Sequence, residues 1–321
     1  MAGILKDEFR FRENIPTTIS RQAQAYLQGT RVVDLDPSRP DWPEVVKATY
    51  ELYVQLNAEL KAKYVQNLDE LNIAGVPVSV ITPRNYDKAN DARAICYMHG
   101  GAYVLFNPQN TYGTWAPLAC ASGLKIYAVD YRLAPQHPYP AAPDDCFHVY
   151  REMIKQYAPE SLGIFGDSAG GALALVTALR AHKEGMPLPA ALALFSPATD
   201  VTKTGDTYYT NQGLDIVINY ERNLLKAIEA YAVDHDPRDP QISPIYADFP
   251  PGLPPTMILS GTRDLLLSCC VRLYRAMKKA GNTVELNLWE GMWHDHIGFP
   301  DMPETDEAFT DMSAFFRLHL K

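Results

Sequence analysis

The stretch LGIFGDSAGGALALVTAL, residues 162–179, decides the fold. It joins a short apolar run, 162–165, to a longer apolar segment of helical length, 172–179, through a turn rich in glycine. Gly166 and Gly170 stand two places before and two places after Ser168, and such glycines permit a tight turn that lifts a serine hydroxyl clear of a sheet. The amides after the serine would lie at a helix N-terminus, where negative charge is favoured. The stretch therefore predicts a nucleophilic serine between a strand and a helix.

Glycines between a strand and a helix also have two other interpretations. The turn could be purely structural, or its amides could bind a phosphate group. A dinucleotide-binding loop is disfavoured, because Gly166, Gly170 and Gly171 do not have the spacing of that motif. The order of strand, turn and apolar helix favours the nucleophile.

Short apolar runs recur along the chain from about residue 73 onward. Besides 162–165 they are residues 76–81, 94–98, 125–129, 190–195, 256–260 and 284–289. Segments of helical length separate most of them. Runs of this kind form a mostly parallel central sheet with helices on both faces. We therefore predict an α/β fold.

Two regions do not follow this rhythm. We predict helix, and no strand, in the residues up to about 66. Apolar side chains recur there at helical spacing from Val45 to Tyr64, and Pro43 suits a first helical turn. The second region is the long connection between the runs 190–195 and 256–260, which contains a helix-like segment, 215–232. A crossover usually needs far fewer residues. We expect both regions to form a lid over one edge of the sheet.

A serine nucleophile requires a base and an acid, and enzymes of this architecture carry them in the chain order serine, acid, histidine. Asp264 follows the run 256–260, and His294 follows the run 284–289. His296 could be the base instead, and spacing alone leaves both open. The two histidines also have the spacing of some metal sites, but no further ligands cluster with them, so we expect no metal.

Residues 99–103, His-Gly-Gly-Ala-Tyr, follow the run 94–98. Small residues there let backbone amides approach a substrate carbonyl and donate hydrogen bonds to a developing oxyanion. Ala169, directly after the serine, offers a further amide. A turn of this composition is often only a turn, but its place after an earlier strand favours an oxyanion hole.

Composition limits the partners and the location. The 321 residues are 47% hydrophobic, and 38 acidic against 29 basic residues give a net charge of −9, so we expect no nucleic-acid partner. The longest apolar stretch, 169–179, is shorter than the roughly 18–20 residues of a membrane span. The first residues lack the apolar core of a secretory signal, and the five cysteines do not suggest a disulfide framework. We expect a cytoplasmic protein, and a homodimer is left open.

Taken together, the motifs resemble those of the hormone-sensitive-lipase-like esterases, bacterial family IV, within the α/β-hydrolase fold. The resemblance rests on blocks at 99–103, 130–135, 166–171, 264–266 and 291–294, and it covers nearly the whole chain from about residue 73. It implies a small-molecule ester as substrate, no cofactor, and a helical cap over the site. It also implies that His294, and not His296, is the base.

The same resemblance implies which amides form the oxyanion hole. They are those of Gly101, Ala102 and Ala169, with Gly100 in support. The chain departs from the family pattern in two places. Ala102 replaces a commoner glycine, and the residues after His294, Asp295 and His296, stand where apolar residues are frequent.

These patterns divide the chain into three parts. We expect N-terminal cap helices in residues 1–70, a catalytic domain in residues 71–197 and 249–321, and a cap insertion in residues 198–248. The expected activity is hydrolysis of short- to medium-chain carboxylic esters through an acyl-enzyme on Ser168, with Asp264 and His294 completing the triad. A lactone or amide hydrolase with the same triad is one alternative. A binding protein without catalysis on the same fold is another.

Overall fold

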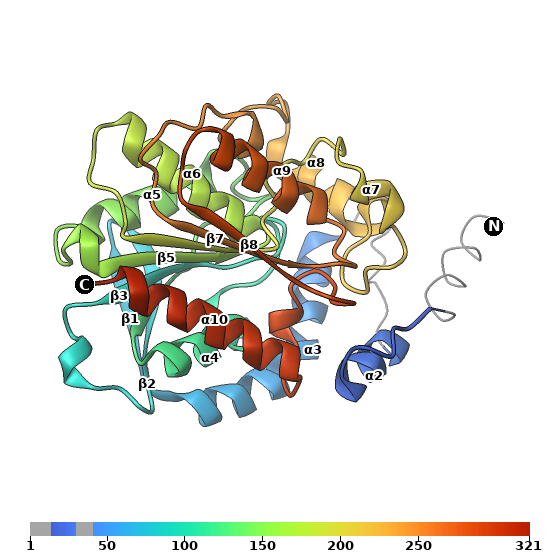
Figure 1. The fold of residues 1–321 in the computed structure, drawn as a ribbon, viewed down its shortest axis with the longest axis horizontal. Helices are drawn as coiled ribbons and strands as arrows, with labels where there is room; N and C mark the ends of the chain where they lie inside the picture. Colours follow the sequence, from blue (N-terminus) through green and yellow to red (C-terminus); the bar gives the residue numbers. More distant parts are fainter. Residues whose placement is uncertain (1–13, 30–40) are drawn as a thin grey trace.

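The computed structural model describes residues 14–29 and 41–321, and within these ranges a sheet of eight strands forms the centre of the molecule (Figure 1). The strand order is β1-β2-β4-β3-β5-β6-β7-β8. Strands β3 to β8 pair in parallel, whereas β2 is antiparallel to both β1 and β4. The bounds are β1 Val65–Ile73, β2 Val76–Pro83, β3 Ala94–Met98, β4 Lys125–Val129, β5 Leu162–Asp167, β6 Ala191–Phe195, β7 Thr256–Gly261 and β8 Val284–Trp289.

Helices cover both faces of this sheet. Figure 1 shows α5, α6 and α9 on one face and α4 and α10 on the other, and each face has its own apolar core. Leu173 and Leu273 lie in the first core, and Trp115 and Phe316 lie in the second. The helix bounds are α2 Arg21–Gly29, α3 Trp42–Tyr64, α4 Tyr112–Ser122, α5 Ala141–Met153, α6 Ala169–Lys183, α7 Thr207–Thr210, α8 Leu225–Ala232, α9 Leu267–Lys279 and α10 Pro303–His319. The predicted α/β fold with helices on both faces is confirmed.

All seven predicted apolar runs are strands, and the structure adds an eighth strand, β1, that the sequence pattern does not predict. Its residues are VQNLDELNI, and the first of them fall in the predicted N-terminal helix, which ends at Tyr64 instead of near residue 66. β1 is an edge strand whose burial is confined mainly to its two ends, Val65 and Ile73. Polar residues can occupy such a strand because one edge and much of its surface face water. The turn into β2 at Ala74-Gly75 has positive φ at both residues, +55° and +88°, as a tight hairpin requires.

The predicted helix at 215–232 is also wrong in its first part. Residues 220–224 form a π-helix, η4 Tyr220–Leu224, which leads into α8, whereas 215–219 are not helical. The carboxylate of Asp215 accepts hydrogen bonds from the amides of Val217 and Ile218, at 2.8 and 3.1 Å, and thus holds a turn in place of a helix. Asn219 then caps the π-helix by accepting from the amide of Arg222.

Helix α2 packs against residues that lie much later in the chain. Ala23 and Leu27 share a small apolar cluster with Ile216, Met292 and Trp293, the last two being the residues just before His294. In Figure 1 α2 and α3 lie toward the same end of the sheet as α7 and α8. No helix within the described ranges is both long and apolar enough to cross a membrane.

Candidate active site

Ser168 occupies the turn between β5 and α6, as the sequence predicts. Its φ is +52°, a left-handed conformation that favours glycine and is strained for a serine. The turn is held by a hydrogen bond from the Ser168 amide to the carbonyl of Phe195 on β6, at 2.9 Å. A Cβ on Gly166 would lie 2.2 Å from the carbonyl oxygen of Gly170, so the close approach of strand and helix requires glycine there. The hydrogen bond to Phe195 and the glycine packing therefore hold the strained Ser168 at the carboxyl end of the sheet.

The structure brings the predicted serine, histidine and aspartate together. His294 Nε2 lies 2.8 Å from Ser168 Oγ, and His294 Nδ1 lies 3.1 Å from Asp264 Oδ1. All three side chains are buried. His296 lies elsewhere: its ring packs against Phe195, and neither of its ring nitrogens has a hydrogen-bond partner in the described part of the chain. The imidazole that can accept the serine proton is therefore that of His294.

Hydrogen bonds orient Asp264 toward the histidine. Its Oδ1 also accepts from the amide of Leu266, at 2.8 Å, and its Oδ2 accepts from the hydroxyl of Ser260, at 2.7 Å. Burial alone would raise the pKa of Asp264, but the charge and hydrogen bond of His294 outweigh burial and lower the pKa. Burial alone would lower the pKa of His294, yet the carboxylates of Asp295 and Asp264 raise it well above its ordinary value. The pair is suited to carry an imidazolium beside a carboxylate.

The turn after β3 lies beside the serine, with its first amide already occupied. Gly100 N donates to Asp167 Oδ2 at 3.0 Å, so Gly100 fixes the turn and its amide is not free for a substrate. The amides of Gly101, Ala102 and Ala169 have no acceptor within residues 14–29 and 41–321. Gly101 and Ala102 have positive φ, +109° and +52°, and a Cβ on Gly101 would lie 2.3 Å from the carbonyl oxygen of Leu105. This backbone can present free amides to an oxyanion.

Asp215 is a site residue that the sequence does not predict. Besides its two bonds within the insertion, its Oδ2 accepts from the amides of Leu265, at 2.9 Å, and His294, at 3.1 Å. Burial and the nearby charge of Asp264 raise the pKa of Asp215 to about 6. One carboxylate thus joins the insertion to the loops that carry both the acid and the histidine. Nothing in the local sequence marks this aspartate, because its partners are backbone amides far along the chain.

Asp215→Asn is expected to destabilise the protein and lower its activity. The amide group of asparagine would place an NH2 against two backbone N–H donors, a loss of about 2 kcal/mol of unfolding free energy. Because the loop of His294 would be less well held, kcat should fall as well. Thermal unfolding and steady-state kinetics would measure both effects. Asp234→Asn, at an exposed position of the same insertion, is the matched control, and an Asp215→Asn protein that melts with the wild type would contradict the assignment.

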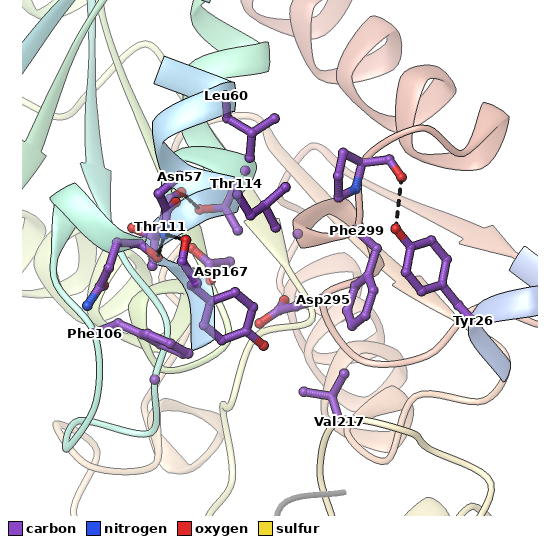
Figure 2. Close-up of a pocket in the computed structure, with 17 residues that line it drawn as sticks. Tyr26, Asn57, Leu60, Phe106, Thr111, Thr114, Asp167, Val217, Asp295 and Phe299 are labelled. Carbon is purple, nitrogen blue, oxygen red and sulfur yellow. Dashed lines mark hydrogen bonds between the residues drawn. The ribbon is translucent and has the colours of Figure 1, made fainter. Parts of the chain in front are cut away.

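A pocket of about 240 Å³ opens beside the serine turn (Figure 2). Figure 2 shows the carboxylates of Asp167 and Asp295 facing it, between Phe106 on one side and Phe299 and Tyr26 on the other. The lining is mostly apolar, and it comes from α2, α3, the start of α4, the end of β5, the loops after β3 and β8, and the connection between β6 and β7. The lining residues include Tyr26, Tyr53, Leu56, Asn57, Leu60, Gly101, Phe106, Thr111, Thr114, Asp167, Val217, Asp295 and Phe299.

The fold and the arrangement of these side chains define the class of the protein, an α/β hydrolase. Residues 95–298 match the family model described as the alpha/beta hydrolase fold. An esterase of Acinetobacter venetianus is 34% identical over 231 residues, 71% of this chain and 76% of the relative. An acetyl-hydrolase of Streptomyces hygroscopicus is 36% identical over 230 residues, 71% of this chain and 76% of the relative.

Solved structures agree with the sequence relatives. A crystallised esterase superposes with a TM-score of 0.86 at 30% identity, covering 96% of each chain. An esterase from the bacterial hormone-sensitive lipase family superposes with a TM-score of 0.77 at 29% identity, covering 88% of this chain and 99% of that one. The chain therefore belongs to the alpha/beta hydrolase fold family, and within it to the hormone-sensitive-lipase-like carboxylesterases.

Proposed function

We propose that this protein hydrolyses short- to medium-chain carboxylic esters through an acyl-enzyme on Ser168. The observation that carries the proposal is the hydrogen-bonded series from Ser168 Oγ to His294 Nε2, at 2.8 Å, and from His294 Nδ1 to Asp264 Oδ1, at 3.1 Å. Distances of this size allow direct proton transfer from the hydroxyl to the imidazole. The names of the relatives, esterase and acetyl-hydrolase, support the same substrate class.

The reaction has two halves. In the first, Ser168 Oγ attacks the ester carbonyl carbon while His294 Nε2 accepts the serine proton, and Asp264 holds the imidazole tautomer and stabilises the cation. The tetrahedral intermediate then collapses, the ester C–O bond breaks, and His294 gives the proton to the leaving alcohol oxygen. In the second half water replaces the alcohol: His294 accepts a proton from water, which attacks the acyl carbon, and the proton returns to Ser168 Oγ as the acid leaves.

The negative charge that develops on the carbonyl oxygen needs donors in each half. The unoccupied amides of Gly101, Ala102 and Ala169 are the proposed donors, and Ala169 lies at the N-terminus of α6, where the helix dipole adds to the effect. Gly100 acts indirectly, because its bond to Asp167 sets the direction of the turn. The methyl group of Ala102 leaves its amide available.

The pocket supports the proposed chain length. Its volume of about 240 Å³ lies below the roughly 300–1,000 Å³ of pockets for drug-sized ligands. An acyl group of a few carbons fits such a space better than a long fatty chain. Because α2, α3 and Val217 of the insertion contribute to the lining, we also propose that the N-terminal helices and residues 198–248 form a cap over the catalytic domain.

Covalent labelling tests the nucleophile. A fluorophosphonate probe should phosphonylate Ser168 with loss of fluoride, and peptide mass spectrometry should locate the adduct on that residue. A protein that binds esters without reacting would stay unlabelled, and an adduct elsewhere would contradict the proposed site. A panel of p-nitrophenyl esters with acyl chains of increasing length, run beside lactones and anilides, separates an esterase from a lactone or amide hydrolase.

We also propose that the protein works in the cytoplasm. All five cysteines are free thiols, and four of them are buried, which fits a reducing cytoplasm. A homodimer also stays a proposal, which sedimentation of the purified protein would decide.

A further inference from the structure

Asp295 places a second carboxylate against the catalytic imidazole. Its Oδ2 lies 3.2 Å from His294 Nε2, the same nitrogen that lies 2.8 Å from Ser168 Oγ. Asp264 contacts the opposite nitrogen, Nδ1. The ring of His294 is therefore between two carboxylates.

The backbone aims this side chain at the site. Asp295 has φ +49° and ψ +42°, a left-handed conformation that aspartate tolerates better than most residues. Its amide donates to Ser196 Oγ at 3.3 Å, which holds the turn against the end of β6. Its other oxygen, Oδ1, is buried without a hydrogen-bond partner in the part of the chain that the structure describes. Figure 2 shows the carboxylate directed into the pocket.

The chemistry of an imidazole nitrogen decides when this contact is favourable. In the neutral ring with its proton on Nδ1, Nε2 has only a lone pair, which accepts from Ser168 and repels a carboxylate. Once Nε2 has taken the serine proton the ring is a cation, and it forms an ion pair with Asp295 Oδ2 at 3.2 Å. The contact therefore stabilises the charged form of the ring in preference to the neutral form.

We infer that Asp295 is a second carboxylate partner of the catalytic histidine, which stabilises the imidazolium during acyl transfer and sets the acid limit of activity. The inference rests on the proposed function of Ser168 and His294. Two consequences follow with opposite signs. Loss of Asp295 removes stabilisation from the transition state and so slows the reaction at its alkaline plateau. It also lets the imidazole of His294 stay neutral, and therefore act as a base, at lower pH.

The other acidic groups around the ring do not duplicate this contact. Asp264 faces Nδ1, and Asp215 accepts from the backbone amide of His294 and does not contact its ring. Asp167 is bonded to Gly100 and to the hydroxyl of Tyr97, and burial and the charge of Asp295 raise its pKa well above the ordinary value. Burial alone would lower the pKa of His294, but Asp295 and Asp264 raise it, in keeping with the geometry.

The test is the pH profile of kcat/KM for p-nitrophenyl acetate between pH 5 and 9. Asp295→Asn removes the charge and keeps the shape, and Asp295→Gly removes the group and suits the positive φ. Asp301→Asn is the matched control, because Asp301 also has a positive φ, +63°, but its side chain is 83% exposed.

In both Asp295 variants the midpoint of the acid limb should fall by about one pH unit, and the plateau should fall about tenfold. Asp301→Asn should follow the wild-type profile. Acid limbs that coincide with the wild type in either Asp295 variant would overturn the inference, even if the plateau fell, since a purely structural role lowers the plateau alone. Ser168→Ala distinguishes the two proposals. If that variant kept its activity, the proposed function itself would fail, and the role of Asp295 with it.

Discussion

Ser168→Ala is expected to lower kcat for p-nitrophenyl acetate by about 10⁶-fold, the scale of loss found when the nucleophile of a serine protease is removed. The hydroxyl of Ser168 is the atom that His294 Nε2 contacts at 2.8 Å, and an alanine methyl group has no proton to give and no electrons to attack a carbonyl. Residual turnover would come from binding and from the oxyanion amides alone. Initial rates with purified protein at alkaline pH would measure the loss.

The fold should be unaffected by this substitution. The turn is held by the amide of Ser168 and by glycine packing, neither of which involves the hydroxyl, and removing one hydroxyl oxygen does not open a cavity of note. Circular dichroism and the melting temperature should therefore match the wild type. Ser122→Ala, which removes a buried hydroxyl that donates within α4, is a control for the loss of a serine. Wild-type rates in the Ser168 variant would exclude the proposed mechanism.

Gly170→Ala is expected to have the largest effect on stability. A Cβ at this position would lie 1.9 Å from the carbonyl oxygen of Met98 and 2.5 Å from that of His99. These are backbone atoms at the end of β3, so no flexible side chain can move aside, and α6 would have to shift away from the sheet. Overpacking in a core usually lowers the free energy of unfolding by about 1–3 kcal/mol. Because the neighbouring atoms at Gly170 belong to the backbone, we expect a loss of at least about 3 kcal/mol there.

Chemical denaturation would measure the effect, as a lower unfolding midpoint or as loss of soluble protein. Gly29→Ala is a useful comparison, because no atom of residues 14–29 and 41–321 lies within 4 Å of a Cβ built there. That variant should retain the wild-type midpoint. If Gly170→Ala unfolded at the wild-type denaturant concentration, the turn would have more room than the packing indicates.

The interior of the sheet was predictable because its strands carry a simple signal. Runs such as 94–98 and 191–195 are buried on both faces and are therefore continuously apolar. β1 carries the opposite signal, since Asn67, Asp69 and Glu70 disfavour strands in general. It forms because β2 supplies its pairing partners through a tight turn. The strand propensity of single residues does not include the stabilisation that a neighbouring strand provides.

The candidate site divides in the same way. Ser168, Asp264 and His294 each follow an apolar run, so the ends of parallel strands bring them together without knowledge of the loops. The amide of Gly100 is occupied by Asp167, and Asp215 accepts from the amide of Leu265. Both hydrogen bonds join segments that are distant in the sequence. The direction of the Asp295 side chain depends on one left-handed residue. Features of this kind are set by tertiary contacts and leave no periodic trace in the sequence.

The packing of α2 has a consequence for how the protein is made. Ribosomes release α2 early, but the buried side chains that it packs against, Ile216, Met292 and Trp293, emerge much later. The apolar face of Ala23 and Leu27 must therefore stay without its native partners through most of translation. Docking of α2 can therefore follow only after the loop that carries His294 has been synthesised. A nascent chain would therefore reach its native active-site packing only after α2 has docked against Met292 and Trp293, the residues just before His294.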